Sequence, residues 1–288
     1  MKNPPFDNRL IITHAQSTEA ADFNLEVTMD SGQVFGFVKQ GGAVYRGDIG
    51  GQNISFYRKN NRLFWDQCIS EKTLRRYFDL DRDLSPVYRA LKADPKLVAA
   101  YNSLRGLRLI QQDPWQGLAG FILSSNNNVK RIQRIWSAMI EYYSTKRKSG
   151  VMGFPSAREI ADTHENTLRQ LGLGYRAPFL WASSVFVANN PQCFEYIREE
   201  SYERALEKVL CFPGIGPKVA DCVLLYAFQK YEAFPVDVWI LKIVRRLYFN
   251  NRKVSEDRVR SFAQARWGEH AGYIQQYLFH GARTGILG

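Results

Sequence analysis

Two residues of the segment 205–240, ALEKVLCFPGIGPKVADCVLLYAFQKYEAFPVDVWI, are candidates for chemistry. Lys218 follows Pro217, which predicts the first turn of a helix, and the helix dipole disfavours a cation there. An uncharged lysine amine is a nucleophile, and a carboxylate such as that of Asp237 stabilises positive charge. Each residue also has a plainer explanation: Lys218 can contact phosphate or solvent, and Asp237 can cap the helix that follows it.

The glycines before Lys218 predict a tight hairpin between two helices. The first helix ends near Cys211, Pro213 to Gly216 form the turn, and Pro217 begins the second helix. The backbone N–H groups of Gly214, Gly216 and Val219 would then face one point beside a helix N-terminus, where an anion binds. Such a helix-hairpin-helix, over about residues 203–229, grips a DNA backbone without reading its sequence. The alternative is an ordinary helix–helix turn.

Composition agrees with a polyanionic partner. The 288 residues include 39 Lys and Arg against 28 Asp and Glu, a net charge of +11. The four cysteines, at 68, 193, 211 and 222, form no CxxC pair, so we expect free thiols rather than a zinc or iron–sulfur site. The N-terminus lacks the apolar stretch of a signal peptide, and the longest uncharged run, residues 177–194, contains two prolines. These features predict an intracellular protein that does not enter a membrane.

The elements that must position these residues fall into two regions. Residues 23–29 alternate apolar and polar side chains, and β-like stretches follow at 34–38, 43–49, 54–58 and 62–65, separated by Gly-Gly and Asn-Asn turns. After Ser70 the apolar residues recur with helical spacing. We predict an α+β protein with a small antiparallel β-rich domain, including linking helices, over 1–105 and a larger all-helical domain over 106–288.

Five motifs in order along the chain carry a family resemblance. They are SGQVFGF (31–37), SSNNNVKRI (124–132), LGLGYRA (171–177), PGIGPKVADC followed by PVDV (213–238), and AGYIQQYLF (271–279). Together they resemble the bifunctional 8-oxoguanine DNA glycosylases of the Ogg type, within the helix-hairpin-helix DNA glycosylase superfamily. The resemblance implies a base-excision repair enzyme with glycosylase and AP lyase activity on duplex DNA.

For the chemistry, the resemblance implies that Lys218 attacks C1′ of the damaged nucleotide and forms a Schiff base. Asp237 would stabilise the developing positive charge on the sugar and help to position the amine. Elimination at the 3′ phosphate follows from the imine, and neither step needs a cofactor. The target nucleotide must leave the base stack before Lys218 can reach it.

The resemblance also implies a pocket for the damaged base. The backbone carbonyl of Gly32 would accept the N7–H that 8-oxoguanine has and guanine lacks. Cys222 and Phe279 would sandwich the purine, and Gln275 would bind its Watson–Crick edge. Without the resemblance, Gly32 reads as a turn glycine, and Cys222 and Phe279 as core residues.

The remaining implications concern the opposite strand and the hairpin. Tyr175 would fill the gap in the helix, and the orphaned cytosine would be contacted by Asn126, Arg131 and Arg176. A structural cation, monovalent or other, would be held by backbone carbonyls of the hairpin, at Leu210, Phe212 and Ile215. Two departures are visible: Trp239 stands where eukaryotic relatives have a phosphate-contacting histidine, and Pro217 where relatives can have threonine.

Other functions remain open at this point. One is a related glycosylase acting on other oxidised or on alkylated bases, although the four-cysteine cluster of the endonuclease III type is absent and Lys218 supplies a nucleophile that monofunctional enzymes lack. The other is a noncatalytic DNA-binding module that uses the hairpin only for phosphates. The expected partner is duplex DNA containing 8-oxoguanine, and the expected state is a monomer.

Overall fold

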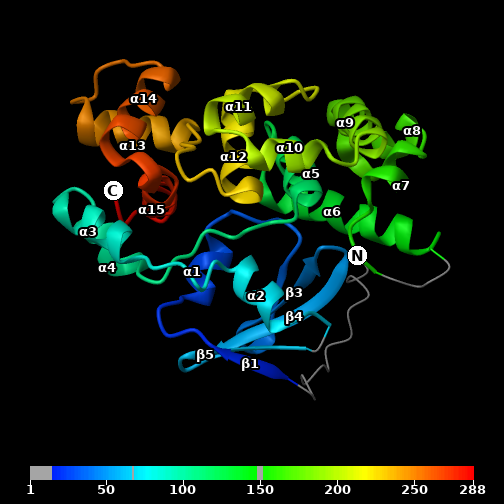
Figure 1. The fold of residues 1–288 in the computed structure, drawn as a ribbon, viewed down its shortest axis with the longest axis horizontal. Coiled ribbons are helices and arrows are strands. Elements are labelled where there is room, and N and C mark those ends of the chain that lie inside the picture. Colours follow the sequence, from blue (N-terminus) through cyan, green and yellow to red (C-terminus); the bar gives the residue numbers. More distant parts are fainter. Residues whose placement is uncertain (1–14, 67, 148–151) are drawn as a thin grey trace.

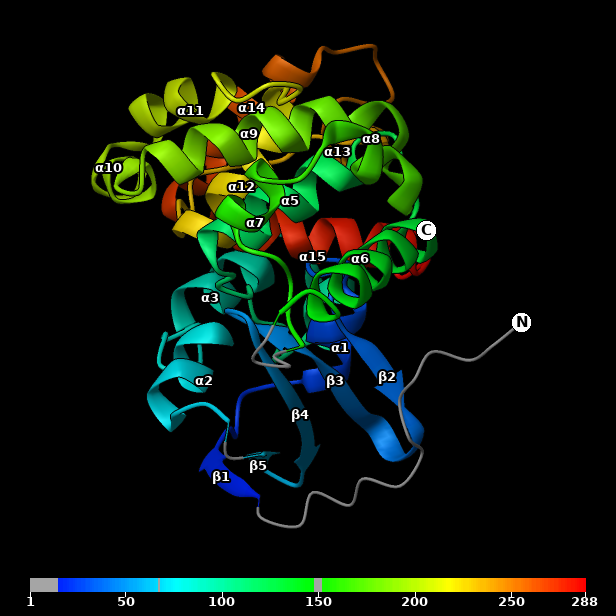
Figure 2. The ribbon, with the colours of Figure 1, turned by 90° about the vertical axis from the view of Figure 1, so that its right-hand side faces the viewer.

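The computed structural model describes residues 15–66, 68–147 and 152–288. Its described strands form one five-stranded sheet in the order β1-β5-β4-β3-β2, with every neighbouring pair antiparallel. The strands are β1 (Gln16–Glu19), β2 (Val38–Gln40), β3 (Val44–Ile49), β4 (Gln52–Lys59) and β5 (Arg62–Trp65). The sheet lies at one end of the molecule and the helices cover the other (Figure 1, Figure 2). The predicted α+β class with an antiparallel N-terminal sheet is therefore confirmed.

The expected strand at residues 23–29 is wrong, because this segment contains the helix α1 (Leu25–Asp30). The side chain of Asn24 caps the helix by accepting from the backbone N–H of Val27 at 3.1 Å. Leu25, Thr28 and Met29 are buried, which is the i, i+3, i+4 spacing of a helix face. The apolar residues of this segment fit the spacing of a strand as well as that of a helix, and the Asn24 cap favours the helix.

The rest of the chain is helical. The α-helices are α2 (Glu71–Tyr77), α3 (Ser85–Ala93), α4 (Val98–Leu104), α5 (Pro114–Ser124), α6 (Val129–Ser144), α7 (Ala157–Ala161), α8 (Glu165–Leu168), α9 (Ala177–Asn189), α10 (Cys193–Glu199), α11 (Tyr202–Leu210), α12 (Pro217–Phe228), α13 (Val238–Tyr248), α14 (Glu256–Trp267) and α15 (Ala271–Arg283). Shorter turns of helix are η1 (Gly41–Ala43), η2 (Arg169–Leu173), η3 (Gly174–Arg176) and η4 (Gly268–His270).

The described residues form two hydrophobic cores. The smaller core lies under the sheet and includes Phe56 and Leu63, both 0% exposed. The larger core joins the helices, and it includes the buried faces of α3 and α4. These two helices therefore pack with the helical part, although they precede the predicted boundary at residue 105. That boundary stays a prediction.

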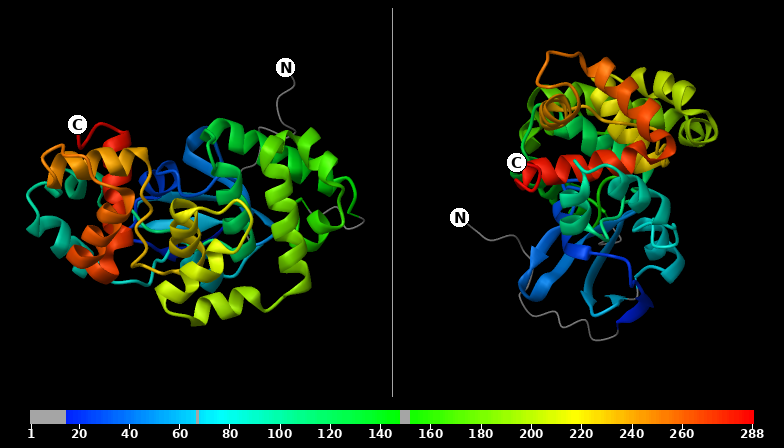
Figure 3. Two further views of the ribbon diagram at one scale, coloured as in Figure 1. Left: turned by 90° about the horizontal axis from the view of Figure 1, so that it is seen from above. Right: turned by 90° about the vertical axis from the view of Figure 1, so that its left-hand side faces the viewer.

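The hairpin helices lie in the middle of the helical region. Seen from above, α11 and α12 stand between a group formed by α13, α14 and α15 and a group formed by α5 to α9 (Figure 3). Helix α12 is buried from Val219 to Phe228, and its first two residues, Pro217 and Lys218, are less buried. Within the described ranges, no helix is long and apolar enough to cross a membrane. The N-terminal segment, which we expect to lack a signal peptide, includes residues 1–14, and these lie outside the described part of the chain.

Candidate active site

The predicted hairpin is present, and its glycines meet different requirements. Helix α11 ends at Leu210, and α12 begins with Pro217. Gly214 has φ +75°, and a Cβ there would lie 2.5 Å from the ring of Phe179, so both the backbone angle and the packing require glycine. A Cβ at Gly216 would meet no atom within 4 Å. The hairpin therefore presents open backbone at the N-terminus of α12, while Val219 is buried behind it.

Lys218, Asp237 and Cys222 form one electrostatic cluster. Lys218 and Cys222 are one turn apart on α12, and the charge of Lys218 acts on both the thiol and the carboxyl group. Burial raises the pKa of the Cys222 thiol to about 11, although the charge of Lys218 lowers it. The thiol is consequently neutral at pH 7, and Cys222 presents a small uncharged surface beside the lysine.

Asp237 caps a helix and interacts electrostatically with Lys218. It caps α13, because its Oδ1 accepts from the backbone N–H of Ile240 at 2.8 Å. Burial raises the pKa of its carboxyl group, and the hydrogen bond from Ile240 and the charge of Lys218 oppose the rise. A partly desolvated carboxylate next to an amine interacts more strongly with a cation than one in water does. The cap thus holds a charged group beside Lys218.

The turn that contains Gly32 is fixed by side chains of the helical region. The carbonyl of Asp30 accepts from Arg283, that of Ser31 from Gln276 at 3.0 Å, and that of Gln33 from Gln112 at 2.9 Å. Gly32, between them, has φ +82°. Three long-range hydrogen bonds therefore hold this turn against α15 and the segment before α5.

Gly32 lies against the predicted wall of the base pocket. A Cβ at Gly32 would lie 3.5 Å from Cε1 of Phe279, which is half-buried on α15. One turn earlier on α15, the Gln275 Nε2 donates to the carbonyl of Pro235 at 3.1 Å, two residues before Asp237. The Gln275 side chain is 4% exposed, and its Oε1 finds no donor among the described residues. Gln275 therefore carries a buried acceptor without a partner among the described residues.

The four residues predicted for the opposite strand meet at a second place. Arg176 donates through Nε to the carbonyl of Ser125 at 2.8 Å and through Nη2 to that of Asn126 at 2.7 Å. The Tyr175 hydroxyl also donates to Ser125, at 3.1 Å, while its ring is 49% exposed. Arg131 is exposed, and its Nη2 lies 3.9 Å from the Cβ position of Gly174, the neighbour of Tyr175. The loop before α6 and the turn before α9 thus form one unit.

Arg176 has a different environment from the one its predicted contact suggests. It is 1% exposed, and its guanidinium is bound to backbone carbonyls rather than presented on the surface. Asn126, which it holds, has φ +45°, an uncommon angle for a residue other than glycine. In this structure Arg176 positions Asn126, and a contact of Arg176 with cytosine stays a prediction.

A buried ion pair between Asp221 and Arg260 connects α12 to α14. Asp221 is 0% exposed, accepts from Arg260 Nε at 2.7 Å and from the Tyr202 hydroxyl at 2.6 Å. These partners lie on α14 and α11, so the network ties both helices of the hairpin to α14. No pattern in the sequence predicts this network, because charged residues 39 positions apart carry no local signal of contact.

Comparisons with known proteins agree with the motifs. The sequence model of the 8-oxoguanine DNA glycosylase N-terminal domain matches residues 16–118, and that of the HhH-GPD superfamily base excision DNA repair proteins matches residues 119–269. The chain belongs to this Ogg-type glycosylase family. A probable N-glycosylase/DNA lyase of Methanothermobacter thermautotrophicus is 35% identical over 76% of this chain and 78% of its own.

Two further relatives cover almost the whole chain. An N-glycosylase/DNA lyase (OGG1) of Arabidopsis thaliana is 26% identical over 94% of this chain and 78% of its own. The crystal structure of the Clostridium acetobutylicum 8-oxoguanine glycosylase/lyase, in complex with duplex DNA containing cytosine opposite 8-oxoguanine, is 29% identical. It superimposes with a TM-score of 0.84 and covers 94% of this chain and 98% of that chain. This family therefore accounts for both regions of the fold.

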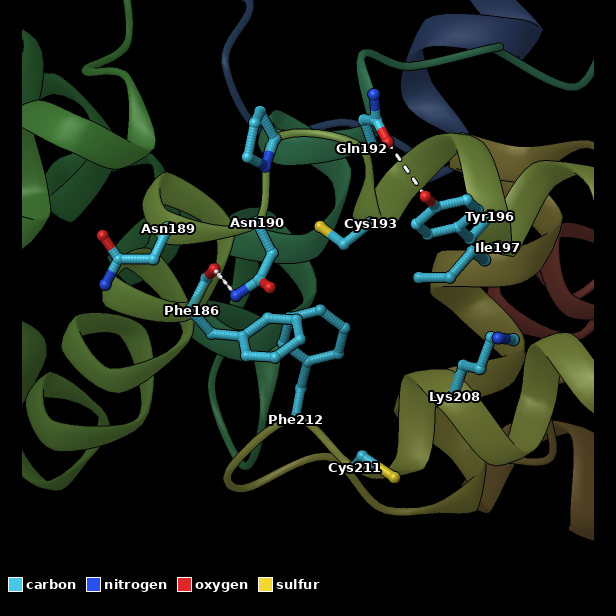
Figure 4. Close-up of a pocket in the computed structure, with 11 residues that line it drawn as sticks. Phe186, Asn189, Asn190, Gln192, Cys193, Tyr196, Ile197, Lys208, Cys211 and Phe212 are labelled. Carbon is cyan, nitrogen blue, oxygen red and sulfur yellow. Dashed lines mark hydrogen bonds between the residues drawn. The ribbon is translucent and has the colours of Figure 1, made fainter.

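A cavity of about 600 Å³ lies outside the predicted base pocket. It opens between α9, α10 and the end of α11, and Figure 4 shows Phe186 beside Phe212 at its floor. Several of its polar side chains are already paired: Tyr196 donates to Gln192 at 2.9 Å, and Asn190 to the Phe186 carbonyl at 2.8 Å. The cavity contains neither Lys218 nor Asp237, so its volume does not mark the reaction centre.

The carbonyls predicted to hold a cation surround the turn of the hairpin. The Phe212 carbonyl accepts from the backbone N–H of Ile215 at 3.2 Å, which leaves its second lone pair for another partner. Leu210 is the last residue of α11, where helix carbonyls lack intrahelical donors. Such neutral oxygens suit a monovalent cation. No group of three or more His, Cys, Asp and Glu side chains that could hold a metal occurs in the part of the chain described.

Proposed function

We propose that this protein is a bifunctional DNA glycosylase that excises 8-oxoguanine opposite cytosine and then nicks the strand 3′ to the abasic site. The observation that carries the proposal is the convergence of the Lys218 and Asp237 cluster with the walls of the predicted base pocket. The Gly32 turn contacts Phe279, and Gln275 binds the loop that leads into Asp237. These residues come from separate parts of the chain, and a phosphate-binding module needs none of them.

Different residues of the pocket recognise the faces and the edges of the base. Phe279 and the neutral thiol of Cys222 stack on the flipped purine, because both faces are apolar. The free Oε1 of Gln275 accepts from the N1–H and N2–H edge of a guanine-type base. The Gly32 carbonyl accepts the N7–H of 8-oxoguanine. Guanine has an acceptor at this position, so it loses one hydrogen bond and leaves two acceptors facing each other, at a cost of ~1–3 kcal/mol.

Lys218 and Asp237 perform the chemistry. As the bond between C1′ and N9 breaks, the base takes the electron pair and the sugar becomes positively charged. The Asp237 carboxylate stabilises this charge. The ammonium group of Lys218 gives a proton to the departing base, and the resulting amine forms the new bond to C1′. Loss of a proton and ring opening give the imine. Loss of a C2′ proton then expels the 3′ phosphate, which completes the β-elimination.

The rest of the surface holds the duplex. Tyr175 fills the space that the flipped nucleotide leaves, while Asn126, Arg131 and Arg176 recognise the orphaned cytosine. The backbone of Gly214, Gly216 and Val219 binds phosphate. Carbonyls of the hairpin hold a monovalent cation there, and catalysis itself uses no cofactor. The protein acts as a monomer on DNA inside the cell, in association with the nucleoid.

Borohydride trapping tests the proposal directly. Borohydride reduces the imine and leaves a covalent protein–DNA adduct, so duplexes with 8-oxoguanine opposite each of the four bases are compared for the wild type and K218Q. We expect an adduct that is strongest opposite cytosine and absent in K218Q, which still binds the duplex. An adduct that persists in K218Q would assign the chemistry to another amine. No adduct and no base release by the wild type, with normal binding, would favour a noncatalytic module.

A further inference from the structure

Arg283 lies at the junction between the Gly32 turn and the wall of the base pocket. A Cβ at Gly32 would lie 2.7 Å from Nη1 of Arg283, and the Arg283 Nη2 donates to the carbonyl of Asp30. Its guanidinium carbon stands 5.4 Å from the centroid of the Phe279 ring, within the range of a cation–π contact. Gln275, Phe279 and Arg283 follow one another at intervals of four on α15 and therefore share one helix face.

The charge of Arg283 is only partly balanced by its neighbours, because burial lowers its pKa while Asp30 and Asp237 raise it. Asp30 is the nearest candidate, but its carboxylate also faces Lys39, at 3.9 Å. His280 lies 3.5 Å from Arg283 Nη2. Burial and the charge of Arg283 lower the pKa of this histidine to about 4, so it is neutral at pH 7. Asp237 also acts on Arg283, and the charge of Asp237 is itself opposed by that of Lys218.

An aromatic wall by itself would favour a positively charged base. The face of Phe279 attracts cations, and N-alkylated purines such as 7-methylguanine carry a positive charge on the ring system. The guanidinium of Arg283 already interacts with that ring, and it would repel a second positive charge stacked on Phe279. 8-Oxoguanine is neutral and meets no such repulsion.

We propose that Arg283 is a specificity-determining residue that excludes cationic, alkylated purines from the base pocket. The inference rests on the proposed function, because it assumes that the damaged base stacks on Phe279.

The variants R283Q and R283K separate charge from structure. Glutamine keeps a donor for the Asp30 carbonyl but removes the charge, and lysine keeps the charge. Each variant is assayed on a duplex with 8-oxoguanine opposite cytosine and on DNA methylated with dimethyl sulfate, and the released bases are separated by chromatography and corrected for spontaneous loss. R158L is the matched control, because Arg158 is an exposed arginine on α7.

We expect R283Q to raise the release of 7-methylguanine relative to 8-oxoguanine at least tenfold, which corresponds to about 1.4 kcal/mol. R283K and R158L should stay within about threefold of the wild type, the ratio that ~0.6 kcal/mol gives. Borohydride trapping on a duplex with a preformed abasic site should be equal in all four proteins, because that step needs no base. If R283Q fails to fold, R283M replaces it as the variant without charge, and equal trapping on the abasic-site duplex shows that loss of the donor to Asp30 has not disturbed the site.

The possible outcomes separate the two proposals. An unchanged ratio in R283Q, with 8-oxoguanine release intact, would overturn the function of Arg283 and leave the proposed activity standing. An equal rise in R283K and R283Q would assign the selectivity to the shape of the guanidinium and would also overturn the charge argument. Failure of the wild type to release 8-oxoguanine at all would overturn the proposed function itself.

Discussion

The substitution Asp237→Asn separates the capping function of this residue from its proposed chemistry. The Asp237 Oδ1 accepts from Ile240 at 2.8 Å, and an asparagine oxygen can accept the same bond. Asparagine and aspartate are equally good N-caps, so D237N should change the free energy of unfolding by less than ~0.5 kcal/mol, whereas D237A should cost about 1 kcal/mol. The carboxylate charge beside Lys218, however, is lost in both.

The expected effect on the reaction is much larger than the effect on folding. Removal of one preorganised group that stabilises developing charge costs a factor of about 10² to 10³ in rate, or roughly 2.7–4 kcal/mol. Single-turnover release of 8-oxoguanine should therefore fall by about two to three orders of magnitude in D237N and D237A alike. Urea unfolding of the same preparations measures the structural part separately.

The dependence of folding stability on pH tests the environment of Asp237 independently of the reaction. Burial raises the pKa of Asp237 above its ordinary value of 3.8. The native protein therefore binds a proton more tightly than the unfolded chain does, and this contribution to stability is lost as the pH rises from below 3.8 through the raised pKa. D237N lacks this loss, so the stability of D237N relative to the wild type should increase over that interval. Wild-type rates in D237N would refute the catalytic assignment and leave Asp237 as an N-cap alone.

Three further changes test other parts of the site. Asp221→Asn removes the buried partner of Arg260 and leaves it the exposed Asp257, at 2.6 Å, so we expect the free energy of unfolding to fall by about 1.5–3 kcal/mol in urea titrations, with a smaller loss in the double variant D221N/R260M. Arg176→Lys loses the fork that binds two carbonyls, which should lower stability by ~1–3 kcal/mol and reduce the preference for cytosine in the four-duplex assay; an unchanged preference would mean that Asn126 needs no such support. Trp239→Ala removes an exposed indole beside Asp237 and should weaken binding to the lesion duplex about three- to tenfold, or ~0.6–1.4 kcal/mol, without altering the salt dependence. A salt slope that falls by about one would instead indicate a phosphate contact of Trp239.

Local signals predicted the hairpin well. The prolines and glycines around Lys218 determine where one helix ends and the next begins, and the structure has those limits at Leu210 and Pro217. The β-like stretches at 43–49, 54–58 and 62–65 correspond to β3, β4 and β5 for the same reason, because paired turn residues separate them. Strand β1 was missed, since its four residues carry no turn signal of their own and pair with residues of β5 from Arg62 to Trp65, more than 40 positions away.

Contacts between distant residues could not be predicted in this way. The resemblance gives a function for Arg176, but only the fold shows that its guanidinium binds the carbonyls of Ser125 and Asn126. Arg283 had one usable signal, its position one turn after Phe279 on the same helix face. Its contact with the Asp30 carbonyl joins residues 253 positions apart, and no periodicity reports such a pairing.

The proposed active site uses both regions of the protein, and the Gly32 turn joins them. In that proposal the β-rich region contributes to the base pocket through this turn. The side chains that bind the carbonyls of the turn, from Gln112, Gln276 and Arg283, belong to the helical region. A carbonyl that must distinguish N7–H from a bare N7 acts through one hydrogen bond, whose strength falls steeply with distance and angle. A shift of the sheet region against the helices would therefore weaken the discrimination of 8-oxoguanine before it affected Lys218 or Asp237, which both lie on the helical side. Loosening this interface should consequently reduce selectivity for the base while the abasic-site lyase step persists.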